Sequence, residues 1–479
     1  MGLIPDLASR RAELSPQAPA FIDHATAEVW SFARTDAAAA RLGAALLQRV
    51  PAGSRVAILC HNRPEFFVAL FACQKAGLIL APLNWRMPLA ELQPILTSVR
   101  AALLLHDDGF ADLAAALGLP TLPLSVPDGP ALPATRIDED APWYVLFTSG
   151  TTGAPKAVIQ TARMALACGV NVAQAMGLTP SDRAPNYLPL FHTAGINLFT
   201  LPLFLWGGCS LILRRFDAEV LAGLLAQGAL TQFFGVPSIF QALASHDLAP
   251  LRLGRVRGWA CGGAALPEPL IRHFAAQGAV IRAGFGMTET GPTGLLIDAE
   301  AALTRIGSVG RPQLMTEARL DGVQDGAAGT GELWLRGPSV TPGYLDNPQA
   351  TAEAFTPDGW LKSGDIASRD ADGYYRIIDR LKDMFISGGE NVFPAEVEAA
   401  LLTHPQVLEA AVIGAPDPRW GESGIAFLIA EPGLDPETLP LWLRARLAPY
   451  KIPRAFHLVA DFPRTATGKV RKPALRALL

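Results

Sequence analysis

The segment "RVAILCHNRPEFFVALFACQKAGLILAPL", residues 55–83, decides the fold class of this chain. Residues 55–60 form an apolar run typical of a buried strand, and residues 64–77 carry apolar side chains at helical spacing. A second apolar run follows at residues 78–83, and the alternation of helix and strand continues through residues 89–106. Strands that are apolar throughout and separated by helices indicate a mostly parallel sheet covered on both faces, so we predict an α/β fold.

The same alternation predicts the domain organisation. It returns after Arg215, whereas residues 331–345 are more typical of β structure with turns. From Asp379 onward the pattern changes to that of a compact α+β unit of about 100 residues, the size of one small domain. We therefore expect a large N-terminal domain, residues 1–380, with mostly parallel sheets covered by helices and a β subdomain. A small, mobile α+β domain is expected at residues 381–479.

The composition is that of a globular protein without a strong charge bias. Half of the 479 residues are hydrophobic and 18% are charged, which argues against extended disorder. The net charge of −4 provides no basic field, so nucleic-acid binding is not expected. The cysteines are odd in number and scattered without a CxxC pair, which fits reduced thiols better than disulfides or a zinc site. They are Cys60, Cys73, Cys168, Cys209 and Cys261.

Two features favour a soluble, cytoplasmic protein without a membrane span. The first residues, "MGLIPDLASRRAEL", do not have the basic-then-apolar layout of a signal peptide. The nearly uncharged segment 196–213 is interrupted by Asn197, Pro202 and the Gly207–Gly208 pair, so it does not form the apolar run of about 20 residues that a membrane helix needs. We expect a buried helix, a glycine turn and a buried strand there instead.

The stretch "FTSGTTGAPK", residues 147–156, follows an apolar run that predicts a buried strand. Glycine, serine and threonine in this place can direct backbone N–H groups and hydroxyls at an anion, and Lys156 adds a positive charge. The Walker A pattern GxxxxGK[ST] does not match, because Pro155 precedes the lysine and Ala157 follows it. Taken by itself, the loop leaves phosphate binding and a plain surface turn about equally open.

Four further motifs accompany this loop. They are "FGMTET" at residues 285–290, "YLDNPQATAEAF" with "DGWLKSGD" within residues 344–365, "DRLKDMFISGGENVFPAEVE" at 379–398 and "PRTATGK" at 463–469. With all five, the chain resembles the adenylate-forming superfamily of acyl-CoA synthetases, aryl-CoA ligases, peptide-synthetase adenylation domains and luciferases along nearly its whole length. The resemblance implies that a carboxylic acid and ATP, with Mg²⁺, form an acyl adenylate and release pyrophosphate.

The resemblance also assigns residues to ATP. The glycine-rich loop would hold the phosphates, and Glu289 with Thr152 would hold Mg²⁺ through oxygen ligands. Phe285 stands where the family commonly has a tyrosine, so stacking on adenine is retained and a hydroxyl contact is lost. Asp365 would accept hydrogen bonds from the ribose and Arg380 would add a cationic contact, with a purely structural Asp–Arg pair as the open alternative. The ATP-binding residues implied are Thr148, Ser149, Gly150, Thr151, Thr152, Gly153, Lys156, Gly263, Ala264, Phe285, Gly286, Met287, Thr288, Asp365 and Arg380.

Transfer of the acyl group to a thiol is a second reaction, which the family performs after rotating its small domain. Lys382 corresponds to the hinge, and Lys469 to the lysine that bridges carboxylate and α-phosphate during adenylation, although the basic run around Lys469 alone would suggest an exposed tail. A plain hairpin turn is the alternative reading of Gly388 and Gly389. The coenzyme A residues implied are Ser387, Gly388, Gly389, Glu390, Trp420, Lys451 and Arg454, with Arg419 as a further phosphate contact.

The resemblance places an acyl pocket around "FHTAGIN", and its predicted wall is small or apolar, which suits a neutral acid. His192 is assigned a catalytic or substrate contact beside Lys469 and Glu289, with a core position as the alternative. Gly284 stands where some dicarboxylate-specific relatives carry arginine, which disfavours a malonate-type substrate. An aryl acid and a short- or medium-chain fatty acid both remain open. The wall residues are His192, Thr193, Gly195, Phe234, Val236, Cys261, Gly284, Met287 and Leu295.

These expectations together predict an ATP-dependent carboxylic acid–CoA ligase. Its partners would be the small-molecule acid, ATP with Mg²⁺, and coenzyme A, with a homodimer left open. The alternative passes the acyl group to a phosphopantetheine carrier, which would be a separate protein because the sequence ends soon after the lysine motif. An inactive paralogue that binds nucleotides and a luciferase-type oxidation are the remaining alternatives.

Overall fold

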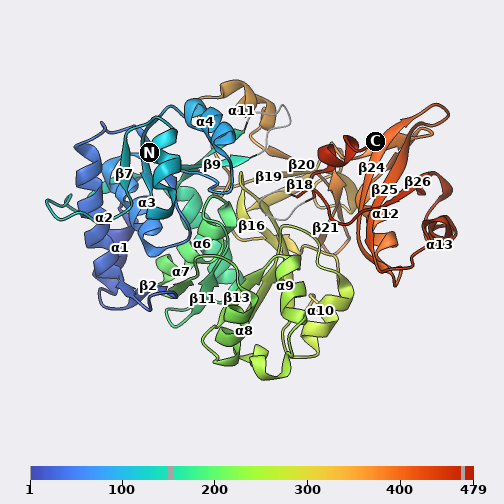
Figure 1. The fold of residues 1–479 in the computed structure, drawn as a ribbon, viewed down its shortest axis with the longest axis horizontal. Coiled ribbons are helices and arrows are strands. Elements are labelled where there is room, and N and C mark those ends of the chain that lie inside the picture. Colours follow the sequence, from blue (N-terminus) through green and yellow to red (C-terminus); the bar gives the residue numbers. More distant parts are fainter. Residues whose placement is uncertain (1, 149–154, 465–469) are drawn as a thin grey trace. The chain divides into compact units, whose positions relative to one another are not determined.

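The computed structural model describes residues 2–148, 155–464 and 470–479. The described part of the chain, shown in Figure 1, divides into two compact units. Unit 1 comprises Met1–Ala318 and Leu335–Leu361, and unit 2 comprises Arg319–Trp334 and Lys362–Leu479. The α/β class is confirmed, whereas the domain boundary expected after Arg380 falls inside unit 2 and stays a prediction.

The first sheet of unit 1 contains the segment that decides the fold. Its strands, in spatial order, are β10 (Lys156–Thr161), β9 (Pro142–Thr148), β5 (Ile79–Pro82), β4 (Arg55–Leu59), β6 (Ala101–His106) and β7 (Thr121–Pro123). Strands β9, β5, β4, β6 and β7 are parallel to one another, and β10 pairs with β9 as an antiparallel hairpin. The helices connected with this sheet are α2 (Phe32–Leu47), α3 (Pro64–Ala76), α4 (Leu89–Ser98), α5 (Ala111–Ala116) and α6 (Ala162–Met176).

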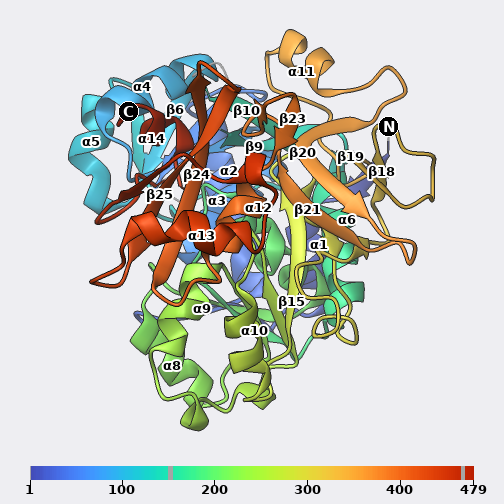
Figure 2. The ribbon, with the colours of Figure 1, turned by 90° about the vertical axis from the view of Figure 1, so that its right-hand side faces the viewer.

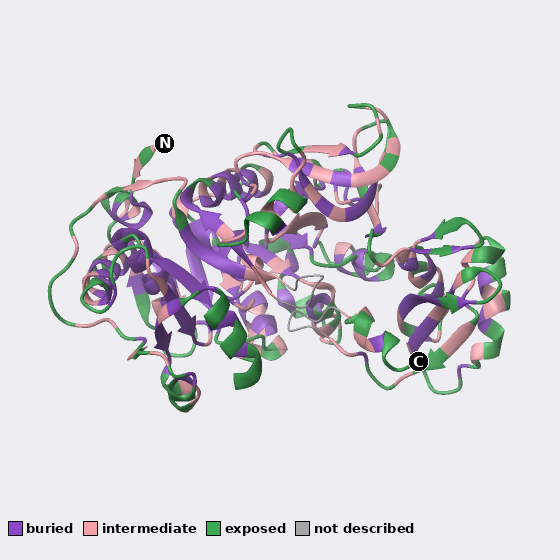
Figure 3. Cartoon of the chain, turned by 90° about the horizontal axis from the view of Figure 1, so that it is seen from above, coloured by how far each residue is buried: buried purple, intermediate pink, exposed green. Residues whose placement is uncertain are grey.

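Helices cover both faces of the first sheet, as its sequence predicts. Val56 and Ile58 of β4 belong to a buried cluster with α2 and α3, whereas Ala57 and Leu59 belong to one with α4 and α5. This division follows from strand geometry, because successive side chains point to opposite faces. Buried residues accordingly concentrate in the strands and on the inner sides of helices, as Figure 3 shows.

A second sheet holds the segment that could be mistaken for a membrane helix. Its strands are β11 (Arg183–Asn186), β12 (Cys209–Ile212), β2 (Pro19–Asp23) and β3 (Val29–Ser31), in that order. A π-helix, η2 (Ala194–Leu198), and helix α7 (Thr200–Trp206) lead to Gly207, whose φ of 87° ends the helix before β12. The predicted order of buried helix, glycine turn and buried strand is therefore confirmed. Helices in the described part of the chain are too short or too polar to cross a membrane.

A third sheet and shorter elements complete unit 1. The strands of this sheet are β13 (Gln232–Gly235), β14 (Gly258–Cys261), β15 (Ile281–Met287), β16 (Gly291–Leu296) and β17 (Arg311–Pro312), in that order. Helices α8 (Ala218–Ala226), α9 (Pro237–Ala244) and α10 (Glu268–Ala275) connect β12, β13, β14 and β15. Unit 1 also contains α1 (Leu7–Leu14), α11 (Pro348–Ala354), and the strand pair β1 (Leu3–Pro5) and β8 (Arg136–Asp138).

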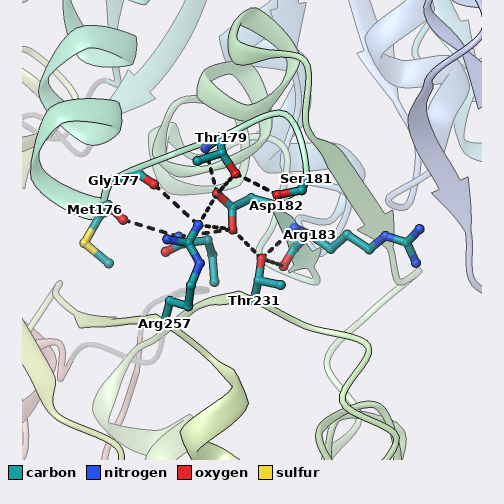
Figure 4. Close-up of polar contacts among 9 residues, drawn as sticks. Met176, Gly177, Thr179, Ser181, Asp182, Arg183, Thr231 and Arg257 are labelled. Carbon is teal, nitrogen blue, oxygen red and sulfur yellow. Dashed lines mark hydrogen bonds and ion pairs between the residues drawn. The ribbon is translucent and has the colours of Figure 1, made fainter.

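A buried aspartate joins the second and third sheets, and Figure 4 shows its contacts. Asp182 precedes β11 and accepts hydrogen bonds from the Thr179 backbone N–H at 2.7 Å and the Thr231 hydroxyl at 2.6 Å. Both of its carboxylate oxygens also lie within 2.7 Å of Nη2 of Arg257. Thr231 directly precedes β13 and Arg257 directly precedes β14, so this carboxylate holds the starts of three strands together.

Unit 2 contains two antiparallel-rich sheets. The first runs β18 (Glu317–Leu320), β19 (Gly329–Arg336), β20 (Leu361–Arg369) and β21 (Tyr375–Arg380). The second contains β23 (Glu390–Val392), β22 (Phe385–Ser387), β25 (Gly421–Ala430) and β24 (Val407–Asp417), with β26 (Ala455–Leu458) also paired to β25. Helices α12 (Pro394–Leu401) and α13 (Leu439–Arg444) pack into one buried cluster with these strands, and α14 (Lys472–Arg476) packs on β24, as Figure 2 allows the reader to follow.

Candidate active site

The hairpin of β9 and β10 brings the two ends of the glycine-rich loop together. Thr148 and Lys156 are direct cross-strand partners at the end of this hairpin where the loop joins its two strands. The predicted phosphate-binding residues between them, Ser149, Gly150, Thr151, Thr152 and Gly153, lie outside the described residues. Their roles, including the part of Thr152 in holding Mg²⁺, therefore stay predictions.

Residues 341–345 run antiparallel beside β10. The Ile159 N–H donates to the Gly343 carbonyl at 3.0 Å, and the Leu345 N–H donates to the Ala157 carbonyl at 2.8 Å. This pairing sets Tyr344 opposite Val158 in a β-bridge. The aromatic ring of Tyr344 then lies 5.0 Å from Nζ of Lys156, within the range of a cation–π contact.

The same tyrosine contacts the glutamate predicted to hold Mg²⁺. The Tyr344 hydroxyl donates a hydrogen bond to Oε1 of Glu289 at 3.1 Å, and the Thr341 N–H donates to the Glu289 carbonyl at 2.7 Å. Burial and the neighbouring Glu289 carboxylate raise the pKa of Tyr344 well above its ordinary value, so its hydroxyl stays protonated and acts as a donor. Lys156 and Glu289, which come from motifs far apart in the sequence, thus meet at one aromatic side chain.

Sequence reasoning assigned no role to Tyr344. The residue begins the quoted motif "YLDNPQATAEAF", and its position at the end of the predicted β structure of residues 331–345 was the available signal. Its partners could not be inferred, because they depend on the pairing of residues 341–345 with β10.

The predicted adenine segment forms the hairpin of β15 and β16. Phe285 is paired with Leu295 and Met287 with Gly291, with an irregular register between the two pairs. A Cβ atom at Gly286 would lie 2.3 Å from the backbone carbon of Pro292, so the close approach of β16 requires glycine at this position of β15. Thr290 completes the turn by accepting a 3.1 Å hydrogen bond from the Met287 N–H. Gly263, with φ of 83°, and Ala264 lie in the exposed turn that follows β14.

Several predicted acyl-wall residues come together at adjacent strands of the third sheet. Gly235 pairs with Cys261 across β13 and β14, and Cys261 pairs with Ala283 of β15, which places Phe234, Cys261 and Gly284 on neighbouring strands. A Cβ atom at Gly262 would lie 3.4 Å from the Phe234 ring, at ordinary contact distance. Burial raises the pKa of the Cys261 thiol to about 12, so this wall position is neutral.

The motif "FHTAGIN" contains further residues of the predicted acyl wall. His192 and Thr193 are partly exposed and directly precede the π-helix that contains Gly195. The ring of His192 lies 4.7 Å from that of Phe191. Ala194 of this π-helix and Phe234 of β13 pack against the same buried cluster, which also contains Leu296 next to Leu295. Val236 lies at the N-terminal end of α9, directly after β13.

In unit 2, Asp365 and Arg380 are cross-strand partners on β20 and β21. Nε of Arg380 lies 2.8 Å from Oδ1 of Asp365, and the aspartate side chain is buried whereas the arginine side chain is 44% exposed. The structural Asp–Arg pair that the sequence left open is therefore formed. A role of the same two residues in ribose binding stays a prediction.

The predicted coenzyme A residues surround a hairpin of unit 2. Gly388 and Gly389, with φ of 62° and 89°, form the turn between β22 and β23, as the alternative reading expected. The Gly388 N–H donates to the Trp420 carbonyl at 2.9 Å, and a Cβ atom at Gly388 would lie 2.8 Å from Cε3 of Trp420. Ser387 is buried and Glu390 is exposed on either side of this turn. The small hairpin thus depends on glycine at the position that faces the indole.

Two of the predicted phosphate contacts already have carboxylate partners. Lys451 lies 2.7 Å from Oε2 of Glu396, and Arg454 forms an ion pair with Asp417. Arg419 lies over the Trp420 ring at 4.8 Å. Coenzyme A phosphates would therefore compete with Glu396 and Asp417 for these cations, and their assignment stays a prediction.

The hinge and the catalytic lysine complete the predicted set. Lys382 is exposed in the turn between β21 and β22, and its role as a hinge stays a prediction. Lys469 lies outside the described residues.

The residues around Glu289 fit a magnesium ion that arrives with a phosphate substrate. Among the described residues, His, Cys, Asp and Glu side chains do not gather in a group of three or more that could hold a metal ion. A closed protein site for Mg²⁺ is therefore not formed in this part of the chain. A buried carboxylate oriented by a hydroxyl suits Mg²⁺, which is commonly bound by one or two carboxylates together with substrate phosphates and water.

Comparison with known families and relatives gives a consistent result. The family described as AMP-binding enzyme matches residues 8–345, and the family described as AMP-binding enzyme C-terminal domain matches residues 396–469. A feruloyl-CoA synthase from Amycolatopsis sp. is 39% identical over 483 residues, which cover 98% of this chain and 97% of the relative. A 2-succinylbenzoate–CoA ligase from Bacillus licheniformis is 34% identical over 484 residues, which cover 98% of this chain and 99% of the relative.

A solved structure is similar over nearly the whole chain. The O-succinylbenzoate coenzyme A synthetase from Bacillus subtilis, in complex with ATP and a magnesium ion, has a TM-score of 0.92 to this structure at 30% identity. The similarity covers 99% of this chain and 100% of that one.

Proposed function

The chain belongs to the AMP-binding enzyme family, and from this premise we propose that it is an ATP-dependent carboxylic acid–CoA ligase for a neutral, apolar monocarboxylic acid. The observation that carries the proposal is the meeting of Lys156 and Glu289 at Tyr344, at the loop end of the β9–β10 hairpin. A cation and a buried carboxylate next to a glycine-rich loop are what a magnesium–triphosphate substrate needs. The similarity to CoA ligases at 39% and 34% identity supports the choice of coenzyme A as the acceptor.

In the first reaction, a carboxylate oxygen attacks the α-phosphorus of ATP. The bond between the α-phosphorus and the bridging oxygen breaks, and pyrophosphate leaves as the acyl adenylate forms. Lys156 and the glycine-rich loop bind the leaving phosphates, and Lys469 stabilises the charge shared by carboxylate and α-phosphate. Glu289 and Thr152 would hold Mg²⁺, which would supply charge neutralisation at the phosphate oxygens.

In the second reaction, the thiol of coenzyme A gives up its proton and its sulfur attacks the acyl carbon. The bond between that carbon and the adenylate oxygen breaks, so a thioester forms and AMP leaves. Rotation of the small domain about Lys382 removes Lys469 and brings residues 387–390 to the acyl group. Their hairpin lets the pantetheine chain approach the backbone closely, because glycine occupies its turn.

The wall residues limit the acid to uncharged side groups. Phe234, the neutral thiol of Cys261 and the absent side chain of Gly284 provide apolar contacts and space but no charge to pair with a second carboxylate. Ferulate is an aryl acid, so the similarity to a feruloyl-CoA synthase supports testing aryl acids first and short- and medium-chain fatty acids next.

The decisive experiment measures pyrophosphate release with ATP and Mg²⁺ over a panel of aryl acids and aliphatic acids, with and without coenzyme A. Multiple turnovers that require coenzyme A, with AMP and an acyl-CoA as products, are expected. A stoichiometric burst that coenzyme A does not extend would contradict coenzyme A as the acceptor and indicate a carrier protein. Absence of release with every acid of the panel would contradict the ligase assignment.

A further inference from the structure

A chain of buried side-chain hydrogen bonds lies behind the predicted site residues. Asn197, in the π-helix η2, accepts a hydrogen bond from the Tyr144 hydroxyl at 2.6 Å. Its Nδ2 group donates to the Thr193 hydroxyl at 3.0 Å and to Oε1 of Gln160 at 3.3 Å. The amide of Gln160 in turn donates to the backbone carbonyl of Thr288 at 3.0 Å.

The chain of hydrogen bonds connects three parts of the predicted site. Tyr144 and Gln160 are cross-strand partners in the hairpin whose two strands are joined by the glycine-rich loop. Thr193 belongs to the predicted acyl wall, and Thr288 directly precedes Glu289 in the ATP segment. The network therefore reaches the phosphate loop's hairpin, the acid site and the nucleotide site.

Because the network is buried, its side chains are held in one arrangement. Tyr144 and Gln160 are each 1% exposed and Asn197 is 2% exposed, so water does not replace a lost partner. Both protons of the Asn197 amide and its oxygen have partners within the network, which determines the orientation of that amide. The wide turn of η2 is held from outside as well, because Asn186 donates to the Gly195 carbonyl at 2.8 Å.

We propose that Asn197 and Gln160 are positioning residues for adenylation: together they set the spacing between the acyl wall and the ATP segment, so that the carboxylate meets the α-phosphate in line. The inference rests on the proposed function. It follows from the network's ends, since one amide contacts an acyl-wall hydroxyl and the other a carbonyl of the nucleotide segment. Neither residue touches a substrate in this assignment, so each acts through its neighbours.

Loss of this positioning should lower the rate of adenylation rather than the affinity for the substrates. A displacement of about 1 Å between reacting groups can lower a rate roughly 100-fold while each substrate still binds. We expect Asn197→Ala to lower the rate of adenylation, measured as ATP–pyrophosphate exchange, by roughly 10- to 100-fold. The dissociation constant of ATP should change by less than about threefold, and so should the rate of thioester formation from preformed acyl adenylate.

Gln160→Ala should likewise lower the rate of adenylation and leave the rate of thioester formation from preformed acyl adenylate nearly unchanged. If both residues act through one network, the Asn197→Ala and Gln160→Ala double variant should be slower than the worse single variant by less than about threefold, because the effects of coupled residues do not add. Independent, multiplied effects in the double variant would contradict a shared positioning role.

Asn171→Ala is the matched control. Asn171 is a fully buried amide on α6 that donates to the Thr293 carbonyl and the Thr316 hydroxyl and accepts from the Met315 N–H at 2.8 Å. Its burial and bonding resemble those of Asn197, but its partners are outside the predicted ATP and acyl residues. Asn171→Ala should therefore lower the unfolding midpoint to a similar extent and leave pyrophosphate exchange of the folded protein within about threefold of the unsubstituted chain.

The measurement uses the full chain, the acid of the panel with the highest rate and its chemically synthesised adenylate, with folded fractions checked by circular dichroism. A selective loss of exchange in Asn197→Ala, absent in Asn171→Ala, is the expected result. Equal loss in both half-reactions, or the same loss in Asn171→Ala, would overturn the positioning role while leaving the ligase assignment intact. If the unsubstituted chain itself shows no acid-dependent exchange, the proposed function fails and the inference fails with it.

Discussion

The hydroxyl of Tyr344 donates a 3.1 Å hydrogen bond to Oε1 of Glu289, and the ring that carries it lies 5.0 Å from Nζ of Lys156. Residues 341–345 hold this tyrosine by pairing with β10, the strand that begins at Lys156. The carboxylate and the ammonium assigned to the magnesium–triphosphate are therefore oriented by one side chain. Tyr344 thus makes two contributions, a hydrogen bond from its hydroxyl to Glu289 and a ring contact with Lys156, and substitutions can test each of them.

Tyr344→Phe removes the hydrogen bond to Glu289 and keeps the ring beside Lys156. A hydrogen bond to a charged group contributes about 1.5 kcal/mol or more, so the apparent affinity for magnesium–ATP should fall roughly tenfold. Tyr344→Leu also removes the cation–π contact with Lys156 and should lower the apparent affinity for magnesium–ATP further. Initial rates over ATP concentrations at several Mg²⁺ concentrations would measure this, and unchanged ATP and Mg²⁺ dependence in Tyr344→Phe would contradict it.

Lys469→Ala should separate the two half-reactions. Without the cation that bridges the carboxylate and the α-phosphate, pyrophosphate exchange should fall roughly 100-fold or more, since removal of one charge-stabilising group costs about that much. Thioester formation from preformed acyl adenylate should be spared. Arg471→Ala, which removes an exposed cation two residues away, is the control and should leave both rates unchanged. An equal fall of both half-reactions in Lys469→Ala would argue against a lysine that acts in adenylation.

Gly388 and Gly389 offer a matched pair for the coenzyme A assignment. Both have positive φ, so alanine at either position carries a backbone cost of about 1 kcal/mol. At Gly388 the new Cβ would also lie 2.8 Å from Cε3 of Trp420, whereas at Gly389 nothing described lies within 4 Å. Gly388→Ala should therefore raise the KM for coenzyme A several-fold more than Gly389→Ala, with pyrophosphate exchange unchanged in both. Equal KM values for the two variants would remove Trp420 from the coenzyme A assignment.

Asp182 should contribute stability that depends on pH. Burial by itself raises the pKa of this carboxyl, but hydrogen bonds from Thr231, Arg257 and Thr179 more than offset it and hold the pKa below its ordinary value of 3.8. Because the pKa in the folded state is the lower one, the contribution is complete above about pH 4 and is lost as the pH falls through the folded-state value.

Asp182→Asn should accordingly lower the free energy of unfolding at pH 7 by about 1.5 to 3 kcal/mol, the range for hydrogen bonds to a charged group. It should also flatten the pH dependence of stability below pH 4. Urea unfolding of the two proteins at pH 7 and at lower pH would measure both effects. Asp128→Asn, at an exposed position, serves as the control and should stay within about 0.5 kcal/mol of the unsubstituted chain. A similar fall in the free energy of unfolding in both variants would contradict a stabilising role of the hydrogen bonds to Asp182.

Much of the fold follows from local pattern. The alternation in residues 55–106 predicted β4, α3, β5, α4 and β6, and the structure contains all of them. The segment 196–213 was expected to be a buried helix, a glycine turn and a strand, and Gly207 ends α7 before β12 in that way. Such features can be predicted from the sequence because apolar periodicity and the conformational freedom of glycine act within a few residues of the chain.

Only some residues of the candidate site could be predicted from the sequence. The motifs that resemble those of the family predicted roles for Lys156, Glu289 and Asp365, because each of these residues stands in a short, recognisable stretch. The same reasoning did not assign Tyr344, Asn197 or Gln160. Asn197 was noted for interrupting an apolar run, and its burial among hydrogen-bond partners was not predicted.

The sequence by itself determined the α/β class, the order of its strands and helices along the chain, and the motifs that point to adenylate chemistry. The tertiary structure alone decided which groups support those motifs. Tyr344 reaches Glu289 because residues 341–345 pair with β10, and Asn197 reaches Gln160 because the π-helix packs behind the β9–β10 hairpin. The physical reason is range: periodicity and turn preferences depend on neighbouring residues, whereas a buried hydrogen bond between distant residues depends on how whole elements pack.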